Sequence, residues 1–273
     1  MKIVAILDSS KGYHVKRFIE DKEDFPEIDI LFSSKLVYPR INRLLKYDTF
    51  FIYSPSLVGE NSFLFSRKLA LYNKTVINKT HYKIGYISKA LLYTLLSENN
   101  ILVPKFFRIF SIGTLNKLGK LNFPIVAKHS YKHRGSEVEL IEDIDSLKTF
   151  IKNHKDKLKY YIFQKYIEYK KDIRLIYVGN KVLGAIQRFG KDFRANISLG
   201  GYAKKCKVNS KIKSISDKIS ELLHANVFSI DILKSKDNEY YVIDFHNIFQ
   251  FKGFENVTGK KVPKSIYEFL VTL

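Results

Sequence analysis

The stretch KDIRLIYVGNKVLGAIQRFGKDFRAN, residues 171–196, decides how this chain is interpreted. Its pattern predicts two short apolar strands with polar and cationic residues at the strand ends. The chain has nine arginines among its 47 lysine and arginine residues, and three of the nine fall in this window. They are Arg174, Arg188 and Arg194. A lone strand-end arginine is usually a solvated charge, but three forked guanidinium groups together favour a site for phosphate or carboxylate. The polar neighbours in the window are Asp172, Asp192 and Asn196.

Composition describes a folded globular chain. Of its 273 residues 45% are hydrophobic and 14% aromatic, which excludes a disordered protein. No apolar run approaches the roughly 20 residues of a membrane span, and MKIVAILDSS predicts a first strand in place of a signal peptide. One cysteine, Cys206, excludes an internal disulfide framework. We therefore expect a cytoplasmic protein with no membrane segment.

A formal charge of +20 is common in proteins that bind nucleic acid, an anionic membrane or an acidic partner, but a lysine-rich composition can also reflect codon bias. The lysines are scattered along the whole chain, without a basic tail or an aromatic-interleaved RNA motif. The charge therefore indicates an acidic substrate or carrier, and gives only weak support to nucleic acid.

The first 85 residues alternate between strand and helix patterns, which predicts a parallel α/β layer. The expected strands are residues 2–7, 28–33, 49–54 and 75–78, and the expected helices are residues 14–22 and 61–74. The rest of the chain predicts an α+β region with antiparallel strand pairs. Its helices are expected at residues 87–100, 143–155, 210–224 and 265–273, and its further strands at residues 124–130, 138–142, 160–167, 227–233 and 239–246.

Two lysines and three residues of metal-binding types stand at informative places on these elements. Lys89 lies in the first turn of a leucine-striped helix, and Lys128 ends the apolar strand PIVAK, where an ammonium could meet a phosphate. Asp231 in VFSIDIL and Asp244 in YYVIDFH lie inside apolar strands, and His246 shares a strand face with Asp244. A carboxylate in an apolar strand is costly unless it is paired or metal-bound, so the pattern favours a divalent cation site over edge charges and a core histidine.

Taken together, these residues resemble the ATP-grasp carboxylate–amine ligases, in particular the RimK-like branch that includes the LysX-like enzymes of lysine biosynthesis. The likeness runs from about Ile77 to Lys260 and is sharpest from Gln164 to Gly259. It implies an ATP-grasp fold, combining α/β and α+β parts, with a leading parallel α/β (pre-ATP-grasp) domain. The implied domains are residues 1–85 for that leading domain, 86–165 for the subdomain with the phosphate lysines, and 166–273 for the catalytic subdomain with the metal site.

The resemblance assigns roles residue by residue. It gives Lys89 and Lys128 to the nucleotide phosphates, and Lys165 and Tyr166 in IFQKYI to adenine, largely through the backbone. It gives Asp172 to the nucleotide, Arg174 to the phosphates or the acyl substrate, and Arg188 to the transferring phosphoryl group. DFRAN, followed by Gly200-Gly201, supplies Arg194 and Asn196. Asp231, Asp244 and His246 stand at the metal positions, and FKGFENVTG matches the substrate-side loop of the family.

The implied reaction is ATP-dependent amide formation through an acyl phosphate, with Mg²⁺ or Mn²⁺ as the metal. The partners it implies are ATP, an amino acid such as glutamate, and a carboxylate acceptor that could be a small molecule, a cofactor tail or an acidic carrier protein. Many such ligases form dimers or tetramers, so a homo-oligomer is also among the partners that the resemblance implies.

Two departures keep other functions open. The family usually has Glu-x-Asn where this chain has Asp244-Phe245-His246, and the loop after Lys128 has only Gly135. A nucleotide-binding relative that has lost catalysis is therefore a second hypothesis. A basic nucleic-acid-binding protein that shares the fold is the third, and the missing KxDG motif argues against a nucleic-acid ligase.

Overall fold

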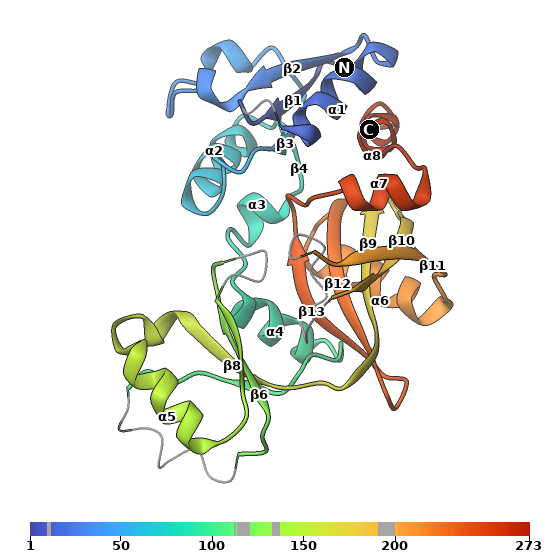
Figure 1. The fold of residues 1–273 in the computed structure, drawn as a ribbon. Helices are drawn as coiled ribbons and strands as arrows, with labels where there is room; N and C mark the ends of the chain where they lie inside the picture. The colour runs from blue at the N-terminus through green and yellow to red at the C-terminus, as the bar shows by residue number, and fades with distance from the viewer. Residues whose placement is uncertain (10–11, 112, 114–120, 133–136, 191–199) are drawn as a thin grey trace.

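The computed structural model describes residues 1–9, 12–111, 113, 121–132, 137–190 and 200–273. Arg194, Asn196 and Gly135, which the sequence singles out, lie outside the described residues. The described chain forms three sheets, which lie at successive places along the length of the molecule (Figure 1).

The first sheet is parallel, with strand order β2-β1-β3-β4. Both faces of its two central strands are covered, because alternate residues of β1 and β3 enter two different hydrophobic clusters. Such strands read as continuous apolar runs, as IVAIL and TFFIY do. The elements of this part are β1 (Ile3–Leu7), α1 (Tyr13–Asp21), β2 (Ile28–Phe32), β3 (Thr49–Tyr53), α2 (Glu60–Leu71), β4 (Thr75–Ile77) and α3 (Thr80–Lys83).

The second sheet is antiparallel, with order β5-β8-β6-β7. Asp143 caps the helix beside it, since its carboxylate accepts a hydrogen bond from the Ser146 N–H at 2.7 Å. Ser88 caps the helix before it in the same way. The elements are α4 (Lys89–Glu98), β5 (Phe106–Phe107), β6 (Ile125–His129), β7 (Val138–Ile141), α5 (Ile144–Asn153) and β8 (Tyr161–Lys165).

The third sheet is the longest, antiparallel throughout, with order β11-β10-β9-β12-β13. One face packs on a hydrophobic cluster with residues of α4 and α6, and the other packs partly on α7 and α8. The elements are β9 (Tyr169–Val178), β10 (Lys181–Phe189), β11 (Tyr202–Cys206), α6 (Ser210–Leu222), β12 (Val227–Ser235), β13 (Tyr240–His246), α7 (Lys252–Thr258) and α8 (Val262–Leu270).

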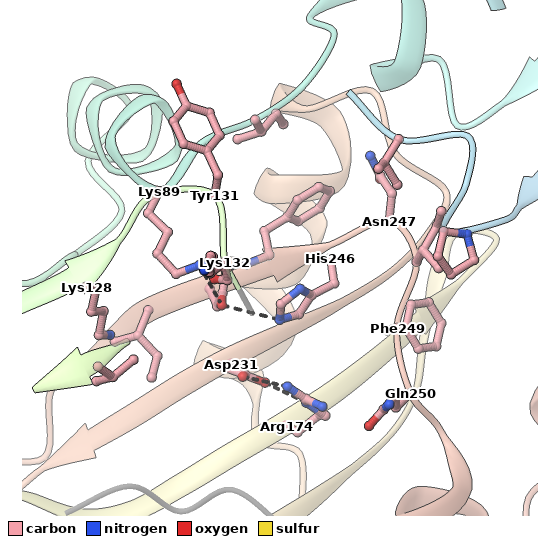
Figure 2. Close-up of a pocket in the computed structure, with 18 of the residues that line it drawn as sticks. Lys89, Lys128, Tyr131, Lys132, Arg174, Asp231, His246, Asn247, Phe249 and Gln250 are labelled. Carbon is pink, nitrogen blue, oxygen red and sulfur yellow. Dashed lines mark hydrogen bonds and ion pairs between the residues drawn. The ribbon is translucent and has the colours of Figure 1, made fainter. Parts of the chain in front are cut away.

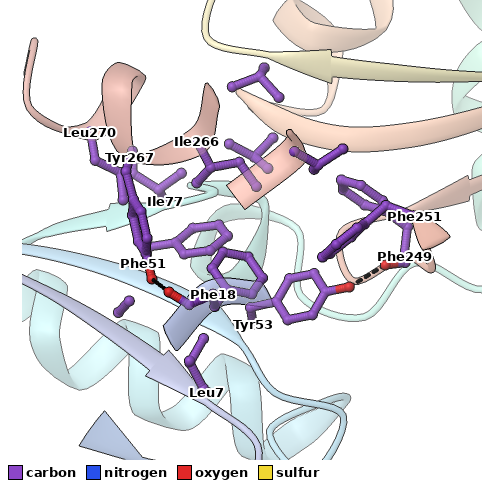
Figure 3. Close-up of a cluster of buried hydrophobic side chains, with 14 of the residues drawn as sticks. Leu7, Phe18, Phe51, Tyr53, Ile77, Phe249, Phe251, Ile266, Tyr267 and Leu270 are labelled. Atoms are coloured by element: carbon purple, nitrogen blue, oxygen red, sulfur yellow. Dashed lines mark hydrogen bonds between the residues drawn. The ribbon is translucent and has the colours of Figure 1, made fainter. Parts of the chain in front are cut away.

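One hydrophobic cluster joins the two ends of the chain (Figure 3). Phe18 and Phe51 of the first sheet region pack with Tyr267 of α8, whose hydroxyl donates to the Phe18 carbonyl at 2.9 Å. Asn78, just after β4, adds a polar link: its side chain donates to the Val227 carbonyl and accepts from the Val227 N–H. The first sheet is therefore fastened to the third at both α8 and β12.

Most predicted elements are present, and the mixture of parallel α/β with antiparallel α+β is confirmed. The three sheets lie within residues 3–77, 106–165 and 169–246, while the division into domains at 85 and 165 stays a prediction. FKGFENVTG, matched to a loop by resemblance, contains the helix α7, which ends at Gly259 in the left-handed conformation. None of the helices in the described part has the length and apolar character that crossing a bilayer requires.

Candidate active site

A cavity of about 1210 Å³ lies between the three sheets. Its walls come from segments far apart in sequence, including the ends of β1 and β3, the start of α4, the strand β6 and the hairpin β12–β13. Several of the residues that the sequence nominated line it: Lys89, Lys128, Tyr166, Asp172, Arg174, Arg188, Asp231, Asp244 and His246. Lys165 is not among the described lining residues; its side chain is exposed and its backbone N–H donates to Lys105 at 2.8 Å.

A row of charged side chains crosses one face of the third sheet. In the strand register Arg188 lies opposite Asp172, Arg174 opposite Asp231, and Asp231 opposite Asp244. These residues come from four adjacent strands, so the sheet's antiparallel pairing, and not sequence proximity, places the charges together.

The two arginines are held by the two aspartates. Arg174 makes a two-pronged contact with Asp231, with Nε to Oδ1 at 2.7 Å and Nη2 to Oδ2 at 2.8 Å (Figure 2). Arg188 contacts Asp172 through Nε at 2.7 Å and reaches Asp231 Oδ2 through Nη1 at 3.1 Å. A guanidinium has five N–H donors, so both arginines keep donors for a ligand while the aspartates fix their positions.

Burial and pairing set the protonation of this row. Burial opposes the charge on Asp231, but Arg174 and Arg188 outweigh it and lower its pKa. Burial likewise disfavours the Arg188 cation, and Asp172 and Asp231 overcome that and raise its pKa. Asp231 and Arg188 are therefore ionised at neutral pH.

The lysines reach the row from the opposite wall (Figure 2). Lys89, buried at the start of α4, places Nζ 3.5 Å from Asp244 Oδ2 and 3.0 Å from the Lys132 carbonyl. Desolvation lowers the pKa of Lys128, at the end of β6, to about 8. Lys128 is thus mostly charged at neutral pH.

Only some of the predicted metal ligands lie close to one another. His246 Nε2 lies 3.4 Å from Asp244 Oδ2, and burial lowers the pKa of His246, which keeps the imidazole neutral. The carboxylate of Asp231 faces Arg174 and Arg188. Within the described residues no group of three or more His, Cys, Asp or Glu side chains is close enough to hold a metal. Magnesium that arrives with ATP needs only one or two protein carboxylates, so Asp231 and Asp244 fit such an ion and His246 fits it less well.

Gln164, Ser62 and His81 also line the cavity but carry no signal that the sequence analysis used. Gln164 is buried in β8, and its Oε1 lies 2.8 Å from the Tyr93 hydroxyl; a glutamine in the middle of the apolar run YIFQK was the available clue. Asn247, the residue after His246, accepts a hydrogen bond from the Asn78 side-chain amide at Oδ1, over a distance of 2.9 Å. This contact gives Asn247 a structural role. Ser62 and His81 form a hydrogen-bonded pair from α2 and α3 that no sequence pattern connects.

The fold and this site define an ATP-grasp protein. Among solved structures, the chain is similar to the ATP-grasp ligase PsnB in complex with a minimal precursor, with a TM-score of 0.77 at 14% identity over 100% of this chain and 99% of the other. It is also similar to a RimK domain ATP-grasp protein from Sphaerobacter thermophilus, with a TM-score of 0.72 at 16% identity over 98% and 99% of the two chains.

The sequence comparisons identify the family. Residues 87–270 match the model of the RimK-like ATP-grasp domain, so the chain belongs to that family. A glutamate–LysW ligase, ArgX, from Sulfolobus acidocaldarius is 31% identical over 190 residues, covering 67% of each chain. A coenzyme γ-F420-2:α-L-glutamate ligase from Methanococcus maripaludis is 28% identical over 278 residues, covering 95% of this chain and 94% of the relative. The family resemblance seen in the sequence is confirmed.

Proposed function

We propose that this protein is an ATP-dependent carboxylate–amine ligase that joins glutamate, or a related amino acid, to a carboxylate acceptor. The observation that carries the proposal is the charge row on the third sheet, where Arg174 and Arg188 are held by buried aspartates inside a shared cavity with Lys89 and Lys128. Family membership and relatives named as glutamate ligases support the same reaction.

The reaction has two steps. A carboxylate oxygen of the acceptor attacks the γ-phosphorus of ATP, and the bond from that phosphorus to the oxygen bridging to the β-phosphate breaks. ADP is released, and the acceptor becomes an acyl phosphate. The amine of the amino acid then attacks the acyl carbon, phosphate leaves, and the amine loses a proton as the amide forms. Little covalent chemistry falls to the protein, so its contribution is alignment and neutralisation of charge.

Each nominated residue has a place in that scheme. Lys89 and Lys128 bind the nucleotide phosphates from one wall, while Arg188 and Arg174 meet the transferring phosphoryl group and the acyl oxygen from the other. Asp172 holds Arg188 in position, since it accepts two of its N–H groups. Tyr166 and the backbone of Lys165 would contact adenine, as the resemblance implies, and the roles of Arg194 and Asn196 also stay predictions. The Mg²⁺ or Mn²⁺ that accompanies ATP would be held by Asp231 and Asp244, with His246 beside them, and would neutralise phosphate charge.

The acceptor is the least determined partner. The relatives' names point to a carrier protein or to a cofactor that carries glutamate, and a formal charge of +20 would attract either if it is acidic. A cytoplasmic location, predicted from the single cysteine, is consistent with a consumer of ATP. A homo-oligomer stays a prediction.

The first test is a thermal-shift titration with ATP, run with magnesium and separately with manganese. A bound nucleotide stabilises the fold by about 2.7 kcal/mol at a hundred times its Kd. We expect this stabilisation in the wild-type protein and its loss in Asp231→Asn. Asp237→Asn is the matched control, because it removes a carboxylate from the exposed turn of the same hairpin.

A hydroxylamine trap then separates ligase from mere nucleotide binding. Hydroxylamine intercepts an acyl phosphate as a hydroxamate, so ATP, metal and an acceptor panel should give hydroxamate and ADP together. ATP binding without ADP from any acceptor would instead support the nucleotide-binding relative, for which His246 in place of an oxygen ligand is the specific observation. Salt-sensitive RNA or DNA binding at physiological ionic strength would be needed to revive the third hypothesis.

A further inference from the structure

Part of the cavity wall is built by the region of the first sheet. It includes the end of β3 and the residues Val58, Gly59 and Ser62 at the start of α2, together with His81 of α3. In a parallel sheet with order β2-β1-β3-β4, the strand order reverses between β1 and β3: β2 is added on one side of β1, and β3 and β4 on the other. Ligands of open α/β sheets bind at such a switch point, beyond the carboxyl ends of the strands.

The start of α2 is suited to an anion. The helix has 12 residues, and its N-cap is Gly59, which has no side chain to accept the first N–H groups; no side-chain cap takes its place. Free N–H groups and the helix dipole give this end a partial positive charge. Outside the neighbouring residues of the chain, no atom lies within 4 Å of the position that a Cβ at Gly59 would take, so the approach to this turn is open.

His81 supplies the second, independent observation. It is 6% exposed, its Nδ1 lies 2.6 Å from the Ser62 hydroxyl, and its Nε2 is buried without a hydrogen-bond partner in the described part of the chain. Burial lowers the pKa of His81 to about 4, so the ring is neutral. A buried polar atom without a partner carries a free-energy penalty, which a ligand in the cavity would remove.

Two acidic side chains bear on this placement. Glu60, in the first turn of α2, is exposed and is not among the described residues that line the cavity. Asp8 lines the cavity at the end of β1, where its Oδ1 accepts a hydrogen bond from Ser56 at 2.8 Å. The negative charge of Asp8 disfavours an anion near β1. An anion would therefore bind on the α2 side of the switch point.

We propose that the start of α2, Ser62 and His81 form a subsite for a non-reacting carboxylate of a substrate. Ser62 donates to Nδ1 and thereby fixes the tautomer in which Nε2–H donates to a carboxylate oxygen, while the first N–H groups of α2 take the remaining lone pairs. The proposal rests on the ligase function and adds a specificity determinant to it. The carboxylate belongs either to the incoming amino acid or to the acceptor, and the chemistry is the same for both.

Binding titrations distinguish these two sources without requiring turnover. With ADP and magnesium present, calorimetry is run with L-glutamate, which represents the incoming amino acid, and with N-acetyl-L-glutamate, whose blocked amine restricts it to the acceptor role. Loss of one hydrogen bond to a charged group costs about tenfold to a hundredfold in affinity. We expect that loss in His81→Leu and a smaller one in Ser62→Ala, for one probe and not the other. His81→Gln, which keeps a neutral donor, should recover part of the affinity.

Several controls keep folding separate from binding. ADP affinity should be unchanged in all three variants, which also shows that the buried substitutions leave the fold intact. His224→Asn removes an exposed imidazole outside the described cavity lining, at a positive φ that asparagine tolerates, and should bind like wild type. In turnover assays the KM for the affected substrate should rise while kcat stays within about twofold, as expected for a residue that binds substrate and transition state alike.

The outcomes are separable. Weaker binding of L-glutamate alone assigns the subsite to the amino acid, and weaker binding of N-acetyl-L-glutamate alone assigns it to the acceptor. Wild-type protein that binds neither probe, or variants that bind both as wild type does, overturns the subsite. A failed hydroxylamine trap overturns the ligase function, and the titrations still report on the subsite in that case.

Discussion

The central strands of the first sheet and the middle of the third sheet are both buried, but with opposite chemistry. Every residue of β1 and β3 is buried and none is charged. At comparable depth the third sheet carries Asp172, Arg188 and Asp231. A buried charge is costly unless it is paired, and here each charge meets an opposite one on the neighbouring strand. The contrast teaches that the first sheet is built for packing and the third for holding charge in place.

Removing one charge from the third sheet should have the largest effect. We expect Arg188→Ala to abolish amide formation, to leave ATP binding largely intact, and to lower the free energy of unfolding by about 3–5 kcal/mol, because Asp172 stays buried without its partner. Turnover and urea denaturation measure the two effects.

A double variant separates stability from chemistry. Asp172→Leu with Arg188→Met replaces the pair by apolar side chains of similar size, which should restore most of the stability but none of the activity. Normal turnover in Arg188→Ala would remove this residue from the mechanism.

A cavity in the first sheet should affect stability alone. Phe50 is fully buried in a cluster formed within the first part of the chain. Phe50→Ala should cost about 3–5 kcal/mol of unfolding free energy, with the ATP Kd unchanged while the protein is folded. Leu71→Ala, at an exposed position on α2, is the control. A raised ATP Kd would mean that packing in the first sheet also positions the charge row.

The pH dependence of ATP binding isolates a charge on the second sheet. Desolvation lowers the pKa of Lys128 to about 8, so its ammonium is present below pH 8 and is lost above it. The ATP Kd should therefore rise with pH, by up to about tenfold per pH unit above the pKa. Lys128→Arg keeps its charge and should flatten the profile between pH 7 and 9.5. An equally steep profile in that variant would assign the titration to another group.

The contact between the two regions at α1 and α7 should give the smallest of these losses in stability. The Tyr13 hydroxyl donates to Glu255 Oε2 at 2.6 Å, and Glu255 Oε1 accepts from the Val262 N–H at 2.8 Å. Tyr13→Phe should lower the free energy of unfolding by about 1.5–3 kcal/mol, because the lost hydrogen bond is to a carboxylate. A double-mutant cycle with Glu255→Gln measures the coupling, and additive losses would show that the two residues do not act together.

Much of the third sheet could be predicted because its signals are local. Asp231 and Asp244 interrupt apolar strands, and Arg174 and Arg188 stand in two adjoining ones, so pattern alone singled them out as candidate site residues. Pattern could not show that the Asp231 carboxylate contacts both Arg174 and Arg188, because those contacts depend on which strands become neighbours. The same limit applies to α7, whose segment reads as a loop until its Phe254 packs into the core.

The sequence by itself determined the periodicity of the strands and helices, the family, and which buried strands would carry charge, since each depends on residues close together in the chain. Only the tertiary structure decided that β9 lies between β10 and β12, which turns isolated charges into a row. It also brought Ser62 to His81 and joined Phe18 to Tyr267 across the length of the chain. These contacts arise from burial of apolar surface shared by distant segments, and no local pattern encodes which segments share it.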